Sequence, residues 1–212
     1  FVSLMLMVFT LGSSILLSAA PQDLPKDIKA EDKEIEAIQF VIDRDLLLLD
    51  SGNVFNPDGV VSRIEFATVL GKALDIQPVK PDTSTFSDVG DKDPGYQYVE
   101  ALVAKEVIPI PSNKEFRPNV PINRADMAVW LINGVGLDKE AAQIKEPVLM
   151  ANDEDEVPDY AVGAMTLAYR SNRQLLGYRP RRLSAPLENA TRREVAKAVY
   201  MMLNPPTRGG TV

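Results

Sequence analysis

Ser62-Arg63-Ile64-Glu65 is the first of three similar tetrapeptides in this chain. The other two are Asn123-Arg124-Ala125-Asp126 and Thr191-Arg192-Arg193-Glu194. A proline stands six residues before each arginine, and apolar residues stand three and seven residues after it. So many matching positions in three copies indicate an internal repeat, and each copy is expected to form one supersecondary unit.

Composition limits the class of protein. The 212 residues carry a net charge of -7, which argues against a nucleic-acid partner, because such proteins present a basic face. The absence of histidine and cysteine removes the commonest general base and the thiolate ligands of metals. No carboxylate pair stands in a recognisable catalytic motif and no glycine-rich phosphate loop is present. We therefore expect a protein that is not an enzyme and uses no metal or cofactor.

Residues 1–20 form an uncharged apolar stretch, which as a helix spans roughly 30 Å, the hydrocarbon core of a bilayer. Two interpretations stand: a retained transmembrane anchor, which we favour, or a signal peptide cleaved after the small residues Ser18-Ala19-Ala20. The following segment, 21–32, reads as an extended linker rich in acids. Cytoplasmic flanks are usually rich in Lys and Arg, so we expect the rest of the chain on the far side of a membrane.

Apolar residues at helical spacing predict two helices in each repeat. The expected domains are repeat 1 over 33–80, repeat 2 over 81–137, a connection over 138–151, repeat 3 over 152–204 and a tail over 205–212. The expected helices begin near residues 33, 62, 96, 123, 160 and 191. The acidic run 152–156 matches no calcium-loop spacing, so we interpret it as a solvated turn.

The repeated tetrapeptide has the composition of a helix start. Its first residue is a good N-cap type and its fourth is an acid, which predicts a capping box in each copy. The pairs are Ser62 with Glu65, Asn123 with Asp126, and Thr191 with Glu194.

The arginine of the motif has no such local explanation. At the first position of a helix a cation meets the positive end of the macrodipole, which costs about 0.3–1 kcal/mol. Arg63, Arg124 and Arg192 therefore need a compensating partner. One possibility is a carboxylate or carbonyl of the neighbouring repeat, and the other is an external anion held at the helix N-terminus.

Three segments of the second copy carry a resemblance to a known family: Phe86-Ser87-Asp88-Val89, Phe116-Arg117-Pro118-Asn119 and Ile122-Asn123-Arg124-Ala125-Asp126. They resemble an S-layer homology repeat, whose second helix opens with a Thr-Arg-Ala-Glu-type motif. The resemblance implies an all-α fold, in which three helix–loop–helix repeats form a three-pronged pseudo-trimer behind the N-terminal transmembrane helix. It also implies that the motif arginines line grooves that, in family members, hold acidic and often pyruvylated wall glycan.

The chain departs from that family in its aromatic residues. The family often has tryptophan where a repeat begins its first helix, for stacking on sugar. Here the candidates are Tyr96, Tyr98 and Tyr160, and the first copy has none. Trp130, the only tryptophan, lies two turns into a second helix and is expected to pack in the core.

Two functions follow from this resemblance. The repeats occupy nearly everything outside the apolar segment, which favours a membrane-anchored interaction protein that docks onto a membrane protein complex as an accessory subunit. The lumenal side of a photosynthetic (thylakoid) membrane is one such setting. The alternative is a cell-envelope tether that binds acidic, pyruvylated wall polysaccharide. In both cases the globular part is extracytoplasmic, in the periplasm, at the cell surface or in the thylakoid lumen, and Arg63, Arg124 and Arg192 carry the contact.

Overall fold

The computed structural model describes residues 24–170 and 174–205. Over these residues it is helical, with isolated β-bridges and no strand, so the expected all-α class is confirmed for them. The α-helices begin and end close to the expected positions, and one further short helix, α5, lies in the connection between repeats 2 and 3. The helices are α1 (Ile35–Asp43), α2 (Arg63–Ala73), α3 (Tyr96–Ala104), α4 (Arg124–Gly134), α5 (Asp138–Gln143), α6 (Val162–Tyr169) and α7 (Arg192–Leu203).

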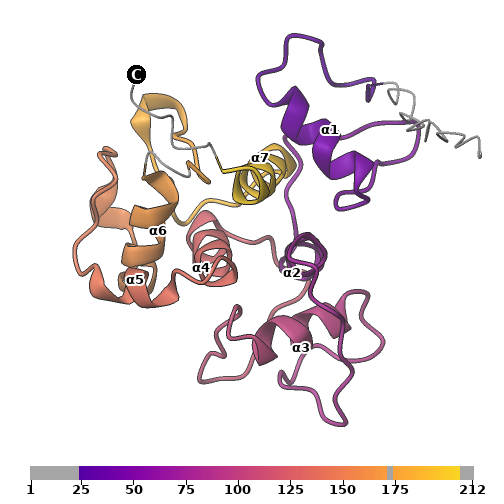
Figure 1. Ribbon diagram of the computed structural model, residues 1–212, viewed down its shortest axis with the longest axis vertical. Helices are drawn as coiled ribbons and strands as arrows, with labels where there is room; N and C mark the ends of the chain where they lie inside the picture. The colour runs from indigo at the N-terminus through magenta and orange to yellow at the C-terminus, as the bar shows by residue number, and fades with distance from the viewer. Residues whose placement is uncertain (1–23, 171–173, 206–212) are drawn as a thin grey trace, which may run out of the picture.

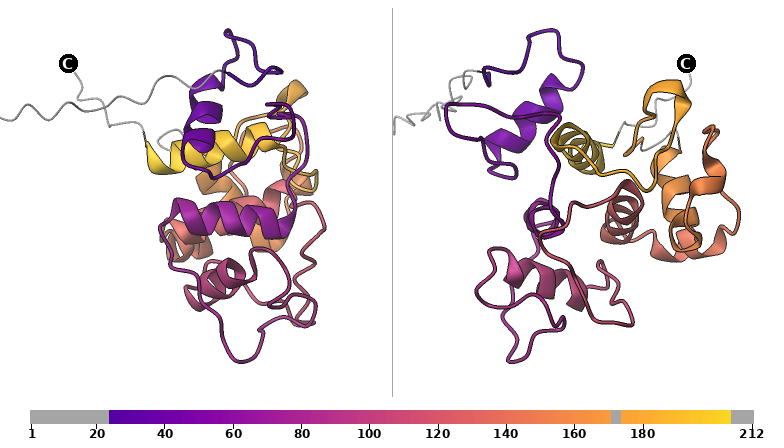
Figure 2. Two further views of the ribbon diagram at one scale, coloured as in Figure 1. Left: turned by 90° about the vertical axis from the view of Figure 1, so that its right-hand side faces the viewer. Right: turned by 180° about the vertical axis from the view of Figure 1, so that it is seen from behind.

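The helices form three arms around a common centre (Figure 1). The second helices of the repeats, α2, α4 and α7, stand around this centre, and the view from behind in Figure 2 shows the same arrangement. Each first helix packs against the second helix of the preceding repeat: α3 against α2, α6 against α4, and α1 against α7. Each arm therefore combines two repeats, and the pairing of α1 with α7 closes the chain into a ring.

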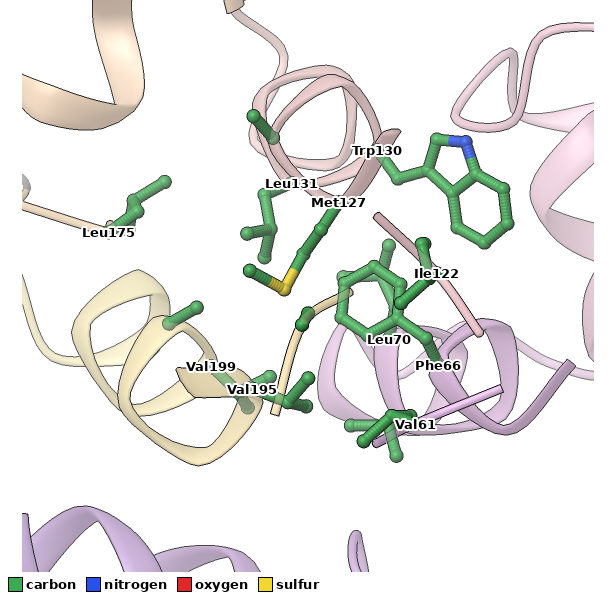
Figure 3. Packing of buried hydrophobic residues seen from close by; sticks show 14 of the residues in the cluster. Val61, Phe66, Leu70, Ile122, Met127, Trp130, Leu131, Leu175, Val195 and Val199 are labelled. Carbon is green, nitrogen blue, oxygen red and sulfur yellow. The ribbon is translucent and has the colours of Figure 1, made fainter. Parts of the chain in front are cut away.

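Apolar side chains of the three second helices and of the segments before them meet at the centre (Figure 3). All are fully buried, and they include Val61, Phe66, Leu70, Ile122, Met127, Leu131, Val195 and Val199. Trp130 is 1% exposed and stacks between Phe66 and Phe116, with ring centroids 5.8 Å from each. The prediction that Trp130 is a core residue is therefore confirmed.

A ring of backbone hydrogen bonds ties the three repeats together just before their second helices. The Ile122 amide donates to the Val61 carbonyl (2.9 Å), and the Ala190 amide donates to the Ile122 carbonyl (2.8 Å). The Val61 amide donates to the Ala190 carbonyl (3.3 Å) and completes the ring. The three residues occupy equivalent positions, so this ring marks a pseudo-threefold axis.

One aspartate in each repeat caps the loop that leads to the axis. Asp27 accepts from the amides of Phe55 and Asn56 at 2.8 and 2.7 Å. Asp88 accepts from the amides of Phe116 and Arg117, both at 2.7 Å. These carboxylates accept from backbone N–H groups that the loop itself leaves without a partner, and those of Phe55 and Phe116 are partly buried. Asp27 lies in the segment expected to be a linker, and we propose that the first repeat begins near this residue.

Asp153 is the equivalent residue of the third repeat, and it corrects the interpretation of 152–156 as a solvated turn. Its side chain is 5% exposed and accepts from the amides of Ser184 and Ala185, both at 2.7 Å. Burial alone would raise the pKa of Asp153, but the two amide donors hold it below its ordinary value. The acidic run is thus anchored by one member that turns inward.

No helix in 24–170 or 174–205 has the length and apolar character needed to cross a bilayer. The transmembrane anchor expected over residues 1–20 lies outside the described residues, as does most of the tail.

Candidate binding grooves between the repeats

The motif arginines form a closed ring of ion pairs between repeats. Arg63 of repeat 1 pairs with Asp126 of repeat 2, and Arg124 of repeat 2 pairs with Glu194 of repeat 3. Arg192 of repeat 3 pairs with Glu65 of repeat 1 at 3.1 Å. Of the two kinds of partner that the sequence leaves open, the structure shows the carboxylate of the neighbouring repeat.

Backbone carbonyls of the same neighbouring repeat complete each contact. The Nε atom of Arg63 donates to the Phe116 carbonyl at 2.7 Å. The Nε atoms of Arg124 and Arg192 make the equivalent bonds to Ser184 (2.8 Å) and Phe55 (2.7 Å). These acceptors offset the unfavourable position of a cation at a helix N-terminus. The arginines are therefore structural joints between repeats.

The repeated prolines belong to the same joints. The first amides of a helix have no acceptor within that helix. Each proline carbonyl accepts a hydrogen bond from one such amide, the second in the second helix of the preceding repeat. These bonds run from Ile64 to Pro118 (3.1 Å), from Ala125 to Pro186 (2.9 Å) and from Arg193 to Pro57 (2.9 Å).

The capping box is present in one copy only. In all three copies the first residue of the motif accepts from the amide three positions on, as expected of an N-cap. Glu194 also accepts from the Thr191 amide at 2.9 Å and completes the box. The prediction is wrong for Glu65 and Asp126, because their carboxylates bind the arginine of another repeat instead.

Each ion pair lies at a surface groove between repeats, and the three grooves differ in size. Groove 1, beside Glu65, has a volume of about 280 Å³. Groove 2, beside Arg63 and Asp126, has about 560 Å³. Groove 3, beside Arg124 and Glu194, has about 230 Å³.

Groove 2 combines polar and aromatic groups. Tyr160 is 59% exposed, and its hydroxyl donates to Asp126 at 2.6 Å. Partial burial of the hydroxyl and the neighbouring Asp126 carboxylate raise the pKa of Tyr160 well above its ordinary value, so it stays protonated as a donor. Asn113, Asn123 and Arg117 also line this groove.

Arg179 of the third repeat lines groove 3. Its guanidinium donates to Glu194 from Nε (3.0 Å) and from Nη2 (2.9 Å). Burial alone would raise the pKa of Glu194, but the hydrogen bonds from Arg179 and the charge of Arg124 hold it below its ordinary value. This acid is therefore bracketed by two guanidinium groups.

Groove 1 is the most apolar of the three. Leu46, Leu48 and Ile64 line it together with Pro94 at the start of α3. Its position equivalent to Tyr160 is occupied by the Pro94-Gly95 turn, where no aromatic ring stands. This turn belongs to the second copy, so the candidates of that copy, Tyr96 and Tyr98, are not at this position.

The structure separates the three tyrosine candidates. Tyr160 alone lies in a groove beside a motif arginine. Tyr96 is buried, and its hydroxyl accepts from Ser84 at 3.2 Å. Tyr98 packs against Gly71 and lines a different cavity, of about 480 Å³, between α2 and α3.

Sequence reasoning missed Arg117 and Arg179 as groove residues. Arg117 lies in the Phe-Arg-Pro-Asn segment, and its position carries asparagine and alanine in the other copies. This difference between copies could have singled out Arg117, because a residue that joins repeats is expected to recur in every copy. Arg179 belongs to a basic loop found only in the third repeat, which offered no equivalent for comparison.

Comparisons with known proteins agree with this fold. The model of the S-layer homology domain matches residues 26–67 and 85–128. A cellulosome-anchoring protein of Acetivibrio thermocellus is 33% identical over 111 residues, which are 51% of this chain and 25% of that protein. A surface-layer 125 kDa protein of Lysinibacillus sphaericus is 30% identical over 105 residues, 50% of this chain and 9% of that protein.

An endoglucanase of a Bacillus species is 23% identical over 177 residues, 84% of this chain and 18% of the endoglucanase. The chain thus spans a quarter or less of each of these relatives. Residues 26–67 and 85–128 thus match S-layer homology domains, and the third repeat makes the same joints with these two repeats.

Proposed function

We propose that this chain is a non-enzymatic cell-envelope tether that binds acidic wall polysaccharide in a groove between its repeats, outside the cytoplasm. The observation that carries the proposal is groove 2, where an exposed aromatic side chain stands beside an arginine–carboxylate pair. Tyr160 offers a ring face to a sugar, Asp126 can accept from hydroxyl groups, and the guanidinium groups of Arg63 and Arg117 attract carboxylates.

The relatives support this choice over docking onto a membrane complex. Two of them are named for anchoring a cellulosome and for a surface layer, and both names describe envelope proteins. The expectation of a photosynthetic accessory subunit depended on the size of the chain. Size no longer favours it, because the chain matches only a small part of each relative.

Affinity capture tests the proposal. Purified acidic wall polysaccharide is immobilised in two forms, one native and one with its carboxyl groups reduced to alcohols. We expect the native form to retain the chain and salt to release it, since exposed charges are screened. Equal retention by both forms, or by neither, contradicts the proposal. Co-purification with a membrane complex in mild detergent, without glycan binding, would support docking instead.

A further inference from the structure

The ring of repeats has three interfaces, and the chain does not run through one of them. It passes directly from repeat 1 into repeat 2 and from repeat 2 into repeat 3. Repeats 1 and 3 meet only through non-covalent contacts, chiefly those of α1 with α7, which lie side by side in Figure 1. We call the contact of residues 24–59 with α7 the closing interface. The ring can open there without any change in how the chain connects its repeats.

Two basic residues of α7 form ion pairs across the closing interface, in addition to the motif arginine. Arg193 donates to Asp32 at 2.5 Å, and Lys197 donates to Glu34 at 2.9 Å. The four side chains are partly buried, with exposed fractions from 13% to 32%. Salt therefore screens these pairs less than it screens fully exposed charges.

These two bases have no charged equivalents in the other second helices. The equivalent positions, counted from the motif arginine, carry uncharged residues: Ile64 and Thr68 in α2, and Ala125 and Val129 in α4. An α1 helix placed against α2 or α4 would leave Asp32 and Glu34 without these partners. The charges thus distinguish α7 from two helices that share its motif and its apolar face.

The closing interface is also polarised, because its acids come from repeat 1 and its bases from repeat 3. Glu36, a third acid of repeat 1, accepts from the Tyr200 hydroxyl at 3.4 Å, and the Tyr200 ring meets Phe40 edge-on at 5.3 Å between centroids. A contact between two different surfaces of one chain is heterologous, so two copies can make it as well as one. The acidic face of one copy fits the basic face of another as it fits its own.

Residues 24–59 are tied together and can change partner as one unit. Asp27, before α1, accepts from the amides of Phe55 and Asn56, after it. The unit is joined to α2 by the short segment 60–62, which ends in the extended backbone of Ser62 (φ −71°, ψ 159°). A short extended connection of this kind is the hinge that an exchange of identical elements between copies requires.

We propose that the closing interface is an interaction surface for a second copy of this chain, and that two copies exchange residues 24–59. In the resulting dimer each repeat 1 closes on the repeat 3 of the other copy. Asp32 and Glu34 select α7 as the partner through Arg193 and Lys197. The contacts of the closing interface are the same as in the closed single chain, and only the path of 60–62 differs. Nothing in this exchange requires glycan binding.

Complementary charge reversals in the full chain test the exchange. One variant carries Asp32→Lys with Glu34→Lys, and the other carries Arg193→Glu with Lys197→Glu. Each variant alone places like charges across its closing interface, whether it closes on itself or on an identical copy. In a pair of unlike variants, both closing interfaces unite opposite charges.

The two variants, one of them labelled with nitrogen-15, are unfolded in urea and refolded separately or together. Native mass spectrometry should find a dimer of one labelled and one unlabelled chain after joint refolding, and no dimer after separate refolding. Amide exchange in α1 and α7 of this dimer should match that of the wild-type chain, because the same interface is formed. Wild-type chain refolded at high protein concentration should contain a dimer with the same protection.

A variant with all four substitutions is the control for folding. Its ion pairs are restored with their direction reversed, so it should be a closed single chain with the unfolding temperature of the wild type. Loss of its fold would show that these charges do not select the partner, and would overturn the proposal. Joint refolding that gives no mixed dimer, while this control folds, would overturn it too. So would a mixed dimer that leaves α1 unprotected, since the two copies would then meet through another surface.

Discussion

The arginine at the start of each second helix joins two neighbouring repeats. Its Nε and one terminal nitrogen join neighbouring repeats in all three copies. Its other terminal nitrogen donates to acceptors in Arg124 and Arg192, whereas in Arg63 it donates to none of the described residues. Replacing a motif arginine by alanine should therefore lower stability, so any test of the proposed binding with such a variant must measure stability separately.

Arg124 is the motif arginine whose loss should cost most. It is 0% exposed, and it holds Glu194, the Ser184 and Gly177 carbonyls and the Tyr169 hydroxyl. Arg124→Ala should lower the free energy of unfolding by about 3–5 kcal/mol, because it leaves buried groups without a partner. Arg63→Ala should cost less, since Arg63 is 12% exposed and makes fewer bonds. Urea unfolding of both variants checks the order, and the reverse order would contradict this account.

A second test concerns the contribution of the buried Asp153 side chain to stability. Asp153→Ala removes the acceptor of two amides in a buried loop and should lower the free energy of unfolding by about 2–4 kcal/mol. Asp155→Ala, two residues away and exposed, is the matched control and should change it by no more than about 0.5 kcal/mol. Similar losses in the two variants would show that Asp153 has no special role.

At the scale of the helix, sequence periodicity predicted where the helices lie but not which helices pack together. Apolar spacing identifies the buried face of α2 from Phe66, Val69 and Leu70. That face carries no information about whether its neighbour comes from the same repeat or the next one. The pairing of α1 with α7 joins segments that are 149 or more residues apart in the sequence, and local pattern cannot specify it.

The motif acids show why a complete local explanation can mislead. A capping box accounts for Glu65 and Asp126 without any partner outside the helix, so the sequence offered no reason to look further. In the third copy Glu194 completes the capping box and also forms ion pairs with Arg124 and Arg179. Asp153 was missed for a different reason: its partners lie 31 and 32 residues away, across a loop longer than in the other copies.

The contact between α5 and α6 is close enough to test with one methyl group. A Cβ at Gly163 would lie 1.9 Å from the Ala141 carbonyl oxygen and 2.5 Å from its carbon, which are backbone atoms that cannot turn away. Gly163→Ala should therefore lower the free energy of unfolding by about 1–3 kcal/mol or displace α5. Thermal unfolding measures the first effect, and amide exchange in α5 measures the second.

Gly134→Ala is the control for this substitution. Its Cβ would meet only the end of the Leu74 side chain, at 2.8 Å, which can adopt another rotamer. Alanine favours the helix by up to about 1 kcal/mol over glycine, so this variant should be neutral or slightly more stable. A loss as large as that of Gly163→Ala would mean that the contact with Ala141 is not the cause.

At the scale of the whole molecule, the ring of ion pairs makes stability depend on carboxylates that join repeats. Hydrogen bonds from Arg193 lower the pKa of Asp32, and Arg179 and Arg124 lower the pKa of Glu194 against the effect of burial. Because these values are depressed only in the folded chain, the unfolded chain binds protons first as pH falls. Stability should be fully present above pH 4.5, the ordinary value for Glu, and should fall as the pH passes through the folded values.

Glu194→Gln tests this dependence. The variant should be less stable than the wild type at pH 7, and the difference should shrink as pH falls below 4.5, where the wild-type carboxylate takes up a proton. Unfolding in urea between pH 3 and pH 7 measures both curves. A difference that stays constant over that range would show that the charge of Glu194 does not stabilise the fold.

The central claim is that this ring of repeats presents one groove to acidic wall polysaccharide. Its most direct test is cosedimentation of the chain with isolated cell walls of the organism that encodes it, before and after their acidic polysaccharide is removed. We predict that wild-type chain and Asp155→Asn sediment with intact walls, that Arg117→Gln stays largely in solution, and that none sediments with stripped walls. Equal sedimentation with intact and stripped walls would contradict the claim.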